Sequence, residues 1–498
     1  MSSTNKSRRK FIKNSALASS LFIVPRHVLG GKGYTSPSDK LNLEGIGLHG
    51  KGKSDILHSS VGGRENVVAL CDVHQGAYGA QEAAKNFPNA KFYTDYREMI
   101  DKEDLDGVTI STPDHTHANI SKVAMEKGIH VYVQKPLTHN VKEARMLTEL
   151  ARKHKIVTQM GNQGGSNPEQ KMIQKWIKDG RIGKVDTVYT WTNRPVWAQG
   201  SPMPKPDPSQ KPVGMDWDLW IGPAKNNGYT PGLHAFSWRG YWDYGTGSLG
   251  DMGCHIMDVP IKALGIYEPY SIEASVPRVP YIADYTPAPI YEESCPPSSY
   301  VTYKFRASEL NDSEVKMIWM DGGIRPSHPE LISDKDDIGD NGVLMIGENG
   351  IIWSDNYGIN ARLYIKGQKG AVEKGKISEI NSVEFGHQKY WVDAIRAGYG
   401  SEEHKNLTSN FDFAGPLSEI VLLGNAAIRS SLLKRSPRSN VFIGKKKLMY
   451  DSNKMQITNL DQANQFLTRD YREGWNLNIL SLIHISEPTR PLYISYAV

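Results

Sequence analysis

Two side chains near the middle of the chain have the types and spacing of an acid–base pair. Asp251 and His255 are four residues apart in a glycine-rich stretch. On a helix this spacing places both side chains on one face, one turn apart. A carboxylate beside an imidazole raises its basicity and selects its tautomer. The pair is therefore a candidate for moving a proton, and an ion pair on an exposed helix face is the alternative.

Lys135 is a candidate cation for the same chemistry. It lies between a predicted strand at 130–133 and Pro136, so its backbone is constrained. Removing a hydride from a carbon that carries a hydroxyl needs a base for the proton and a cation for the developing oxyanion. A surface lysine at a strand end is the alternative interpretation.

A glycine-rich turn near the N-terminus predicts a dinucleotide site. Gly45, Gly47 and Gly50 follow a predicted strand over 41–45 and precede a helix-compatible segment. We expect them to allow a tight turn, close approach to the pyrophosphate, and helix–strand packing, in that order. The phosphates would bind at the helix N-terminus. Asp72 ends the next strand, where a carboxylate holds ribose hydroxyls and repels a 2′-phosphate, so NAD is favoured over NADP.

The elements that must position these residues alternate between strands and helices. We predict strands at 67–72, 107–111 and 130–133 and helices at 74–86 and 95–100. Loops at the carboxyl ends of parallel strands form the ligand crevice. Three such loops are polar, at 111–117, 134–136 and 160–165.

The first and third of these loops supply further cofactor candidates. Asp114, His115 and His117 are too closely spaced for a recognised metal shell, and no further cluster completes one, so we predict no metal. We expect this loop to line the nicotinamide, with Thr112 and Pro113 beginning a helix. In the third loop, two amides contact the cofactor or sugar, or else form a turn: Asn162 and Gln163.

The order of these motifs resembles the Gfo/Idh/MocA oxidoreductases, relatives of glucose–fructose oxidoreductase and inositol dehydrogenase. The resemblance continues through 217–223 and 245–255 and covers about residues 40–477. It implies an α/β fold: a Rossmann NAD-binding domain at 40–157, then an α+β domain at 158–477. The second domain would carry a large, mostly antiparallel sheet that covers the nicotinamide.

The resemblance also implies roles for the candidate residues. Lys135 would be the catalytic lysine beside the cofactor, His255 the general acid/base, and Asp251 a ligand of a substrate hydroxyl. The chain departs from the family at Gln134, where a glutamate commonly precedes the lysine. The departure removes a carboxylate that could tune Lys135.

The second half of the chain contains the remaining predicted elements and an aromatic-rich segment. Strands are predicted at 185–191, 300–305, 314–319, 342–346 and 350–353, and helices at 385–397 and 414–433. Six tryptophans lie between 191 and 242. Aromatic faces suit the C–H faces of sugars, although core packing is the commoner role of any one tryptophan. The candidates for substrate contact are Trp197, Trp238, Arg239, Tyr241 and Trp242.

Both ends of the chain predict segments outside the fold. Arg8 and Arg9 precede an apolar run at 16–29, and residues 1–30 resemble a twin-arginine export signal, with a frayed basic tail as the alternative. We therefore expect a periplasmic protein exported in the folded state. Charged residues interrupt the run, so no stable membrane association is expected. Residues 478–498 resemble translated sequencing-adapter read-through and are interpreted as a non-native tail.

Composition limits the remaining possibilities. The 498 residues are 39% hydrophobic and 23% charged, which is typical of a globular protein of two or three domains. A net charge of +5 does not indicate nucleic acid as a partner. Three cysteines cannot form a disulfide framework. We find no apolar stretch of about 20 residues beyond the N-terminus, which excludes a polytopic membrane protein.

The sequence thus predicts an NAD(H)-dependent oxidoreductase that acts on a sugar, sugar derivative or glycoside with a tightly bound cofactor. The alternative is an NAD-dependent glycoside hydrolase that works by transient oxidation, elimination, water addition and re-reduction. A non-catalytic sugar-binding protein is a third interpretation, and retention of Lys135, Asp251 and His255 argues against it. We expect a homo-oligomer.

Overall fold

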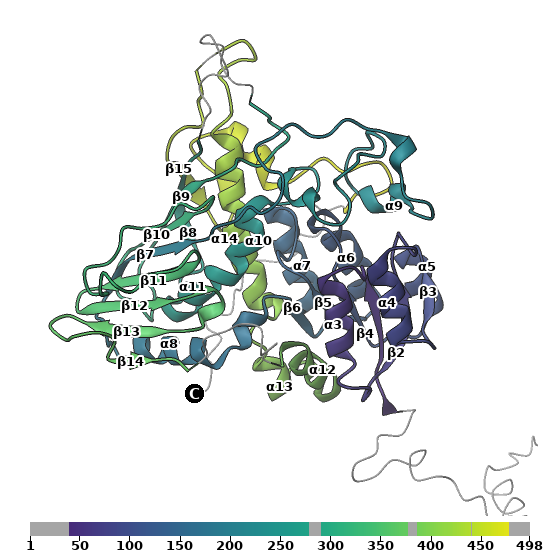
Figure 1. Cartoon of the computed structure of the whole chain (residues 1–498), viewed down its shortest axis with the longest axis horizontal. Coiled ribbons are helices and arrows are strands. Elements are labelled where there is room, and N and C mark those ends of the chain that lie inside the picture. Colours follow the sequence, from purple (N-terminus) through teal and green to yellow (C-terminus); the bar gives the residue numbers. More distant parts are fainter. Residues whose placement is uncertain (1–38, 278–289, 377–385, 440, 478–498) are drawn as a thin grey trace, which may run out of the picture.

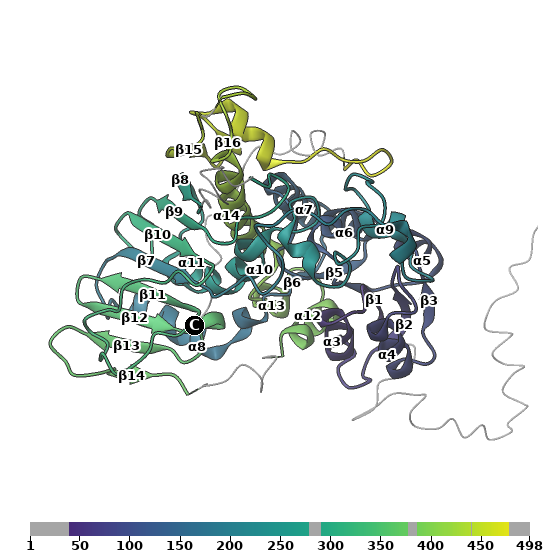
Figure 2. The same cartoon turned by 45° about the horizontal axis from the view of Figure 1, so that its top comes forward.

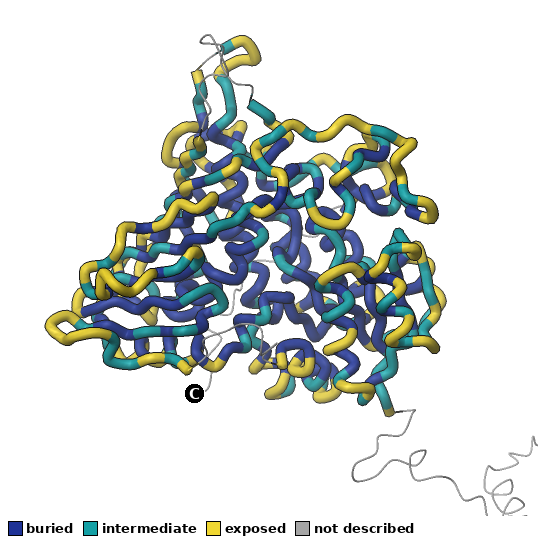
Figure 3. The backbone as a smooth tube through the Cα atoms, in the orientation of Figure 1, coloured by how far each residue is buried: buried dark blue, intermediate teal, exposed yellow. Residues whose placement is uncertain are grey.

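The computed structural model describes residues 39–277, 290–376, 386–439 and 441–477. The predicted export signal and the C-terminal tail lie outside the described residues. Two sheets organise the chain, with the N-terminal sheet on the right of Figure 1 and the larger C-terminal sheet on the left. Figure 3 shows that buried backbone is continuous between them. The two sheets therefore share a central layer in which side chains of both domains meet.

The first sheet has six parallel strands in the order β3-β2-β1-β4-β5-β6. The strand order reverses between β1 and β4, so the loops that follow these two strands diverge and leave a crevice for a ligand. The predicted Rossmann topology is confirmed; β3 was not predicted, and β6 was predicted only as the strand before the polar loop at 160–165. The strands are β1 Asn42–Ile46, β2 Asn66–Cys71, β3 Lys91–Tyr93, β4 Gly107–Ile110, β5 His130–Val133 and β6 Thr158–Met160.

Helices cover both faces of this sheet because its central strands are apolar on both sides. The cores differ: Ile56 of α3 and Trp391 of α12 pack on one face, and Met99 of α5 and Met146 of α7 pack on the other. Part of the C-terminal half therefore returns to complete the first domain. The helices are α3 Lys51–Ser59, α4 Tyr78–Asn86, α5 Tyr96–Lys102, α6 His117–Glu126, α7 Val141–His154, α12 His387–Ala397 and α13 Glu402–Lys405.

The second sheet has ten strands in the order β14-β13-β12-β11-β7-β10-β9-β8-β15-β16. Every pairing is antiparallel except β7 with β10, which confirms the predicted mostly antiparallel sheet. The strands are β7 Val185–Trp191, β8 Pro269–Ser275, β9 Tyr300–Phe305, β10 Val315–Met320, β11 Gly342–Gly347, β12 Gly350–Ser354, β13 Arg362–Ile365, β14 Glu373–Lys374, β15 Leu448–Asp451 and β16 Gln456–Ile457.

Helices between the two sheets carry the site. Figure 2 shows α10 and α14 between the ten-stranded sheet and the Rossmann helices. Glycines along α10 allow close packing: a Cβ at Gly253 would lie 3.0 Å from Val421 of α14. Asp251 and His255 are thereby held on a helix in the protein centre. The remaining helices of the chain are α8 Pro168–Lys178, α9 Trp217–Ile221, α10 Gly247–Ile256, α11 Asp258–Leu264 and α14 Phe411–Ser430.

Helix α14 corrects one statement made from the sequence. Its 20 residues are long and apolar enough to cross a membrane by length and composition, although we found no such stretch in the sequence. Asn410 caps the helix, and Pro416 lies inside it as the sixth helical residue, where proline removes one intrahelical hydrogen bond. Because 89% of its apolar window is buried inside the protein, the helix serves as a core element here.

Candidate active site

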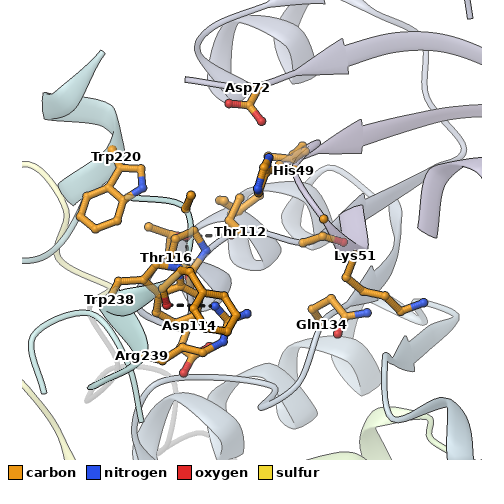
Figure 4. A pocket seen from close by; sticks show the side chains of 18 of the residues that line it. His49, Lys51, Asp72, Thr112, Asp114, Thr116, Gln134, Trp220, Trp238 and Arg239 are labelled. Carbon is orange, nitrogen blue, oxygen red and sulfur yellow. Dashed lines mark hydrogen bonds between the residues drawn. The ribbon is translucent and has the colours of Figure 1, made fainter. Parts of the chain in front are cut away.

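A cavity of about 500 Å³ opens between the two domains, at the crevice that the strand order leaves. Asp72 lies at one end and Asp114, Trp238 and Arg239 lie at the other, with Thr112 between them (Figure 4). The first end belongs to the Rossmann sheet. The second combines Rossmann loops with segments of the C-terminal domain, so the cavity can hold an elongated molecule that contacts both domains.

The glycine turn after β1 exposes backbone to the cavity. Gly47 has a φ of +77°, and a Cβ there would lie 2.8 Å from the carbonyl oxygen of Ser111. Gly50 has a φ of +57°, precedes α3, and has open space around its Cβ position. Both glycines line the cavity. The free N–H groups at the start of α3 can therefore meet a pyrophosphate without side-chain obstruction.

The assignment of the glycines needs one correction. Gly45 lies inside β1, does not line the cavity, and would place a Cβ 3.1 Å from Ile56. The helix–strand packing expected of Gly50 is provided by Gly52, whose Cβ would lie 1.9 Å from the carbonyl oxygen of Gly47. The functional turn is shifted two residues along the chain, because β1 continues to Ile46 before the backbone turns.

Asp72 lies where the second strand was expected to end. Its carboxylate accepts the backbone N–H groups of Leu48 (2.8 Å) and His74 (2.9 Å), which fixes it at the cavity wall. Burial raises its pKa, and the two N–H groups partly offset that rise. The group therefore ties the glycine turn to the end of β2.

The loop after β4 is divided between cavity and core. Thr112 and Pro113 line the cavity, as predicted. His115 and His117 do not, which corrects the prediction that they contact the nicotinamide. Each ring is buried with a backbone carbonyl oxygen at both nitrogens: Tyr244 and Trp220 for His115, Pro136 and Thr112 for His117. Burial lowers the pKa of His115 to about 3 and of His117 to about 4, so both rings are neutral and have a structural role.

The two amides after β6 differ in position. Gln163 lines the cavity. Asn162 is fully buried behind the lining, and neither its amide nitrogen nor its oxygen has a hydrogen-bond partner among the described residues. Direct contact of Asn162 with a ligand, one of the two predicted roles, is therefore not part of this geometry.

Lys135 and Asp251 form a partly buried ion pair at the second end of the cavity. The Nζ atom of Lys135 donates to the Oδ1 atom and the backbone oxygen of Asp251, both at 2.7 Å. Their side chains are 14% and 15% exposed. Burial opposes ionisation of Asp251, but the charges of Lys135 and Arg239 outweigh it and lower its pKa to about 2. The carboxylate stays charged and orients the lysine.

His255 lies one turn beyond Asp251 on α10, as the spacing predicted. Its ring packs on Tyr357 with centroids 4.4 Å apart. Burial first, and then the charge of Lys135, lower the pKa of His255 well below its usual value, although Asp251 acts in the opposite direction. The expected gain in basicity is therefore outweighed, and His255 lines the cavity as a neutral imidazole.

Gln134, which replaces the glutamate common in the family, is hydrogen-bonded in this structure. Its amide nitrogen donates to Asp55 of α3 at 2.8 Å. Asp55 also accepts from Ser111 (2.9 Å) and Gln388 (3.0 Å) and pairs with Lys51 at 3.0 Å. A glutamate at position 134 would place two carboxylates together, which is unfavourable in a buried site. A glutamine at position 134 is therefore compatible with the neighbouring carboxylate of Asp55 on α3.

Asp114 is a cavity residue whose role the sequence did not reveal. Its carboxyl accepts the hydroxyl of Thr246 at 2.5 Å and is 5% exposed. Burial raises its pKa to about 7, opposed by Thr246 and by the charges of Arg239 and Lys135. The signal that could have found it is its place directly after Thr112-Pro113, at a strand end that faces the crevice.

The aromatic segment is only partly at the site. Trp238 and Arg239 line the cavity as predicted. Trp197, Tyr241 and Trp242 do not line it, which corrects their assignment to substrate. Trp197 packs edge-on against Phe236, and Tyr241 donates to the carbonyl oxygen of Pro202 at 3.2 Å. Trp242 lies in the main core. These three follow the commoner role of tryptophan and tyrosine, because their rings turn into the protein.

Several lining residues were missed, among them Trp220, Arg194 and Tyr357. Trp220 lies in the aromatic segment and within the motif at 217–223, but it was not among the predicted substrate contacts. Tyr357 has a φ of +61°, which is rare for a residue with a side chain. No short-range pattern marks Arg194 or Tyr357, because they reach the site through the topology of the second sheet.

The cavity fits a dinucleotide. A Cβ would close the turn at Gly47, the α3 N-terminus faces the cavity, and Asp72 lines the same end of it. Among the described residues, no group of three histidine, cysteine or acidic side chains could hold a metal ion.

Comparison with known proteins agrees with this geometry. Residues 45–162 match the family model described as an oxidoreductase family with an NAD-binding Rossmann fold. Residues 168–278 match the model described as an oxidoreductase family C-terminal alpha/beta domain. The first match confirms the prediction of NAD as cofactor.

The sequence is also similar to individual proteins. Levoglucosan dehydrogenase of Pseudarthrobacter phenanthrenivorans is 26% identical over 186 residues, 37% of this chain and 40% of that protein. Glycosyl hydrolase family 109 protein 1 of Shewanella sp. strain ANA-3 is 30% identical over 182 residues, 34% of this chain and 39% of that protein. These matches thus span about 40% of the length of both relatives.

A solved structure shows the same fold. Levoglucosan dehydrogenase in complex with NADH and L-sorbose has a TM-score of 0.52 and 18% sequence identity, covering 78% of this chain and 97% of that chain. The likeness therefore extends over both domains, well beyond the segment matched in sequence.

Proposed function

Because the chain belongs to the Gfo/Idh/MocA family of oxidoreductases, we propose that it transfers a hydride between a tightly bound NAD and a sugar, sugar derivative or glycoside. The observation that carries the proposal is the Lys135–Asp251 ion pair beside neutral His255. It lies in the same cavity as the Gly47 turn and the start of α3. Acid–base groups and a nucleotide cradle thus face one another.

The chain's own residues handle the oxygen and its proton, while NAD, when bound, supplies the hydride acceptor. Lys135 Nζ is oriented by Asp251 and donates to the substrate oxygen, which stabilises negative charge as the carbon is oxidised. The neutral ring of His255 takes the hydroxyl proton, and the oxygen becomes a carbonyl. Tyr357 packs on that ring and keeps its orientation. The reverse steps reduce a carbonyl.

We further propose export by the twin-arginine route with the cofactor already bound. Free NAD is scarce outside the cytoplasm, so a retained cofactor must be reduced and reoxidised on the enzyme. The support is the Arg8-Arg9 pattern followed by an apolar run. We propose a homo-oligomer without stable membrane association.

The export proposal has its own test. Replacing residues 1–30 with a general secretory signal should deliver protein that lacks nucleotide and is inactive until NAD is added. Nucleotide content and activity of the periplasmic fraction decide the point. Equal occupancy by both routes would show that the cofactor binds after export.

The second candidate function is an NAD-dependent glycoside hydrolase. The similarity to a glycosyl hydrolase family 109 protein favours it. The same side chains would move the protons while NAD, when bound, would accept a hydride from the substrate carbon and return it after the glycosidic leaving group has been eliminated and water has been added. Net cleavage of a nitrophenyl glycoside without release of an oxidised sugar identifies this function, and stable release of an oxidised product identifies the first.

The central test is mass spectrometry of the gently purified full chain, followed by a panel of sugars and glycosides monitored at 340 nm. We expect NAD(H) and not NADP(H), and a change in bound cofactor on addition of substrate. Asp72→Ala should weaken retention. Recovery of NADP with equal ease would contradict the role of Asp72, and absence of any nucleotide would contradict the function.

A further inference from the structure

Positive charge exceeds negative charge at the substrate end of the cavity. Three cationic side chains line it, Lys135, Arg194 and Arg239, against two carboxyl groups, Asp114 and Asp251. Only Asp251 is firmly ionised, because burial leaves Asp114 partly protonated near neutral pH. His255 adds no charge, since it is neutral. At least one positive charge there is therefore without a compensating carboxylate.

The uncompensated cation is Arg194. It follows β7 in the C-terminal domain, and its guanidinium donates at 2.8 Å to the amide oxygen of Asn193, a neutral partner. It forms no ion pair with any residue that the structure describes. By contrast, Lys135 contacts Asp251 at 2.7 Å, and Arg239 shares the same carboxylate at 3.5 Å.

Arg194 lines the same cavity as the reacting groups. Its charge acts on the hydroxyl of Tyr357, whose ring lies on His255. Arg239 is held by Trp238, with the guanidinium carbon 4.3 Å from the ring centroid. Arg194, Lys135 and His255 thus line one cavity, in which Tyr357 packs on His255 and feels the charge of Arg194.

We infer that the substrate is an anionic sugar whose acidic group pairs with Arg194 while its reacting hydroxyl faces Lys135 and His255. A guanidinium offers paired N–H donors that match a carboxylate or phosphate. A neutral sugar would leave Arg194 partly desolvated without a counter-charge, which disfavours binding. The inference rests on the proposed function and specifies its substrate class.

The test uses matched pairs of probes on the full-length holoenzyme. D-Glucuronate is compared with D-glucose, and D-galacturonate with D-galactose, with D-glucose 6-phosphate as the phosphate arm. Binding is measured by tryptophan fluorescence, since Trp238 lines the cavity, and hydride transfer by absorbance at 340 nm. We expect the anionic member of at least one pair to half-saturate at a concentration at least about 10-fold lower.

Arg194→Met should reduce that advantage to less than about 2-fold, because it removes the charge and keeps most of the apolar stem. The matched control is Arg325→Met, on an exposed loop where Arg325 pairs with Asp337. It changes net charge equally and should preserve the advantage. Retained NAD is measured in both variants, because loss of nucleotide in Arg194→Met alone would assign the arginine to the cofactor and overturn the inference.

The remaining outcomes separate this inference from the proposed function. Hydride transfer from neutral sugars without preference for acids overturns the inference and leaves the function intact. Arg194-dependent binding of acids without any change at 340 nm supports the inference and contradicts the function. No binding of any acidic probe up to about 10 mM, on the scale of weak specific affinities, overturns the inference.

Discussion

The two ends of the cavity are built in different ways. At the nucleotide end, consecutive residues provide backbone groups: Gly47 and Gly50 expose the turn, and Asp72 is fixed by two backbone N–H groups. At the substrate end, side chains arrive from segments far apart in the chain, such as Lys135, Asp251 and Tyr357. A ligand part common to many proteins can be bound by a local motif, whereas a specific substrate is bound by long-range packing.

This difference explains why charge is distributed unevenly. The nucleotide end needs few charged side chains, because helix N–H groups and the helix dipole attract phosphate. The substrate end concentrates charged side chains in one partly buried region, where the pKa of Asp114 is raised and that of Asp251 is lowered: Lys135, Arg239, Arg194, Asp114 and Asp251. The first end is therefore sensitive to shape and the second to charge.

The largest expected effect is at the substrate end. Lys135→Ala should lower turnover by at least about 10²-fold, the usual scale for losing a positioned electrostatic or acid–base group. His255→Ala should do the same. Both variants should retain NAD, because neither side chain is part of the glycine turn. Turnover and nucleotide content are measured together, with Lys122→Ala on the outer face of α6 as control. Unchanged turnover in Lys135→Ala would move the chemistry elsewhere.

The next effect tests whether the nucleotide end depends on shape. In Gly52→Ala the new Cβ would lie 1.9 Å from the backbone oxygen of Gly47, so α3 or the turn must move. We expect a loss of about 3 kcal/mol in unfolding free energy, typical of severe overpacking, together with loss of bound NAD. Urea unfolding and nucleotide content provide the measurement.

A matched glycine isolates the close approach from glycine chemistry in general. Gly128 has a φ of +82° and nothing within 4 Å of its Cβ position. Gly128→Ala should cost only about 1 kcal/mol of backbone strain and retain NAD. If the two variants lose NAD equally, the close packing of α3 on the turn is not what forms the nucleotide site.

The same contrast decides what sequence reasoning could achieve. The strands at 130–133, 185–191 and 300–305 agree with β5, β7 and β9 residue for residue, because their apolar runs are bounded by turn signals. Lys135 and the Asp251–His255 spacing were also found. The glycine turn was placed two residues early, since the end of a strand depends on pairing with its neighbour, which short-range patterns do not encode.

What the sequence could not predict depends on the direction in which side chains point. His115 and Trp242 have residue types suited to a site, but their rings turn into the core. Arg194 and Tyr357 have no motif and reach the cavity only because β7 and the loop after β12 end beside α10. Packing, and not composition, therefore decides which of the six tryptophans line the cavity.

A third test concerns the charge of the substrate end. Burial raises the pKa of Asp114 from its ordinary value of 3.8 to about 7 in the folded protein. Between these values the unfolded chain releases a proton that the folded protein keeps, so this group lowers stability as pH rises from about 4 to 7. Asp114→Asn should remove that decline and gain about 2 kcal/mol over native protein at pH 8.

The measurement is urea unfolding of native protein and Asp114→Asn at pH 5 and pH 8. The difference between the two proteins should grow with pH, because all other titrating groups are shared. Thr246 can still donate to the amide oxygen of asparagine, so the loop geometry is preserved. A difference that is the same at both pH values would show that Asp114 is already ionised at pH 5.

The smallest expected effect checks where the substrate end stops. Tyr241 was predicted to contact substrate, but its hydroxyl donates to the carbonyl oxygen of Pro202 and its ring lies in a core cluster with Trp217 and Trp220. Tyr241→Phe keeps the ring and loses one neutral hydrogen bond, worth about 1 kcal/mol of stability. Its KM should change by less than about 2-fold, because the expected change in binding free energy is under about 0.4 kcal/mol.

Trp238→Ala at the cavity wall should raise KM by about 10-fold through lost contact area. An equal rise in KM for both variants would extend the substrate end into the aromatic core and weaken the division between a local nucleotide end and an assembled substrate end.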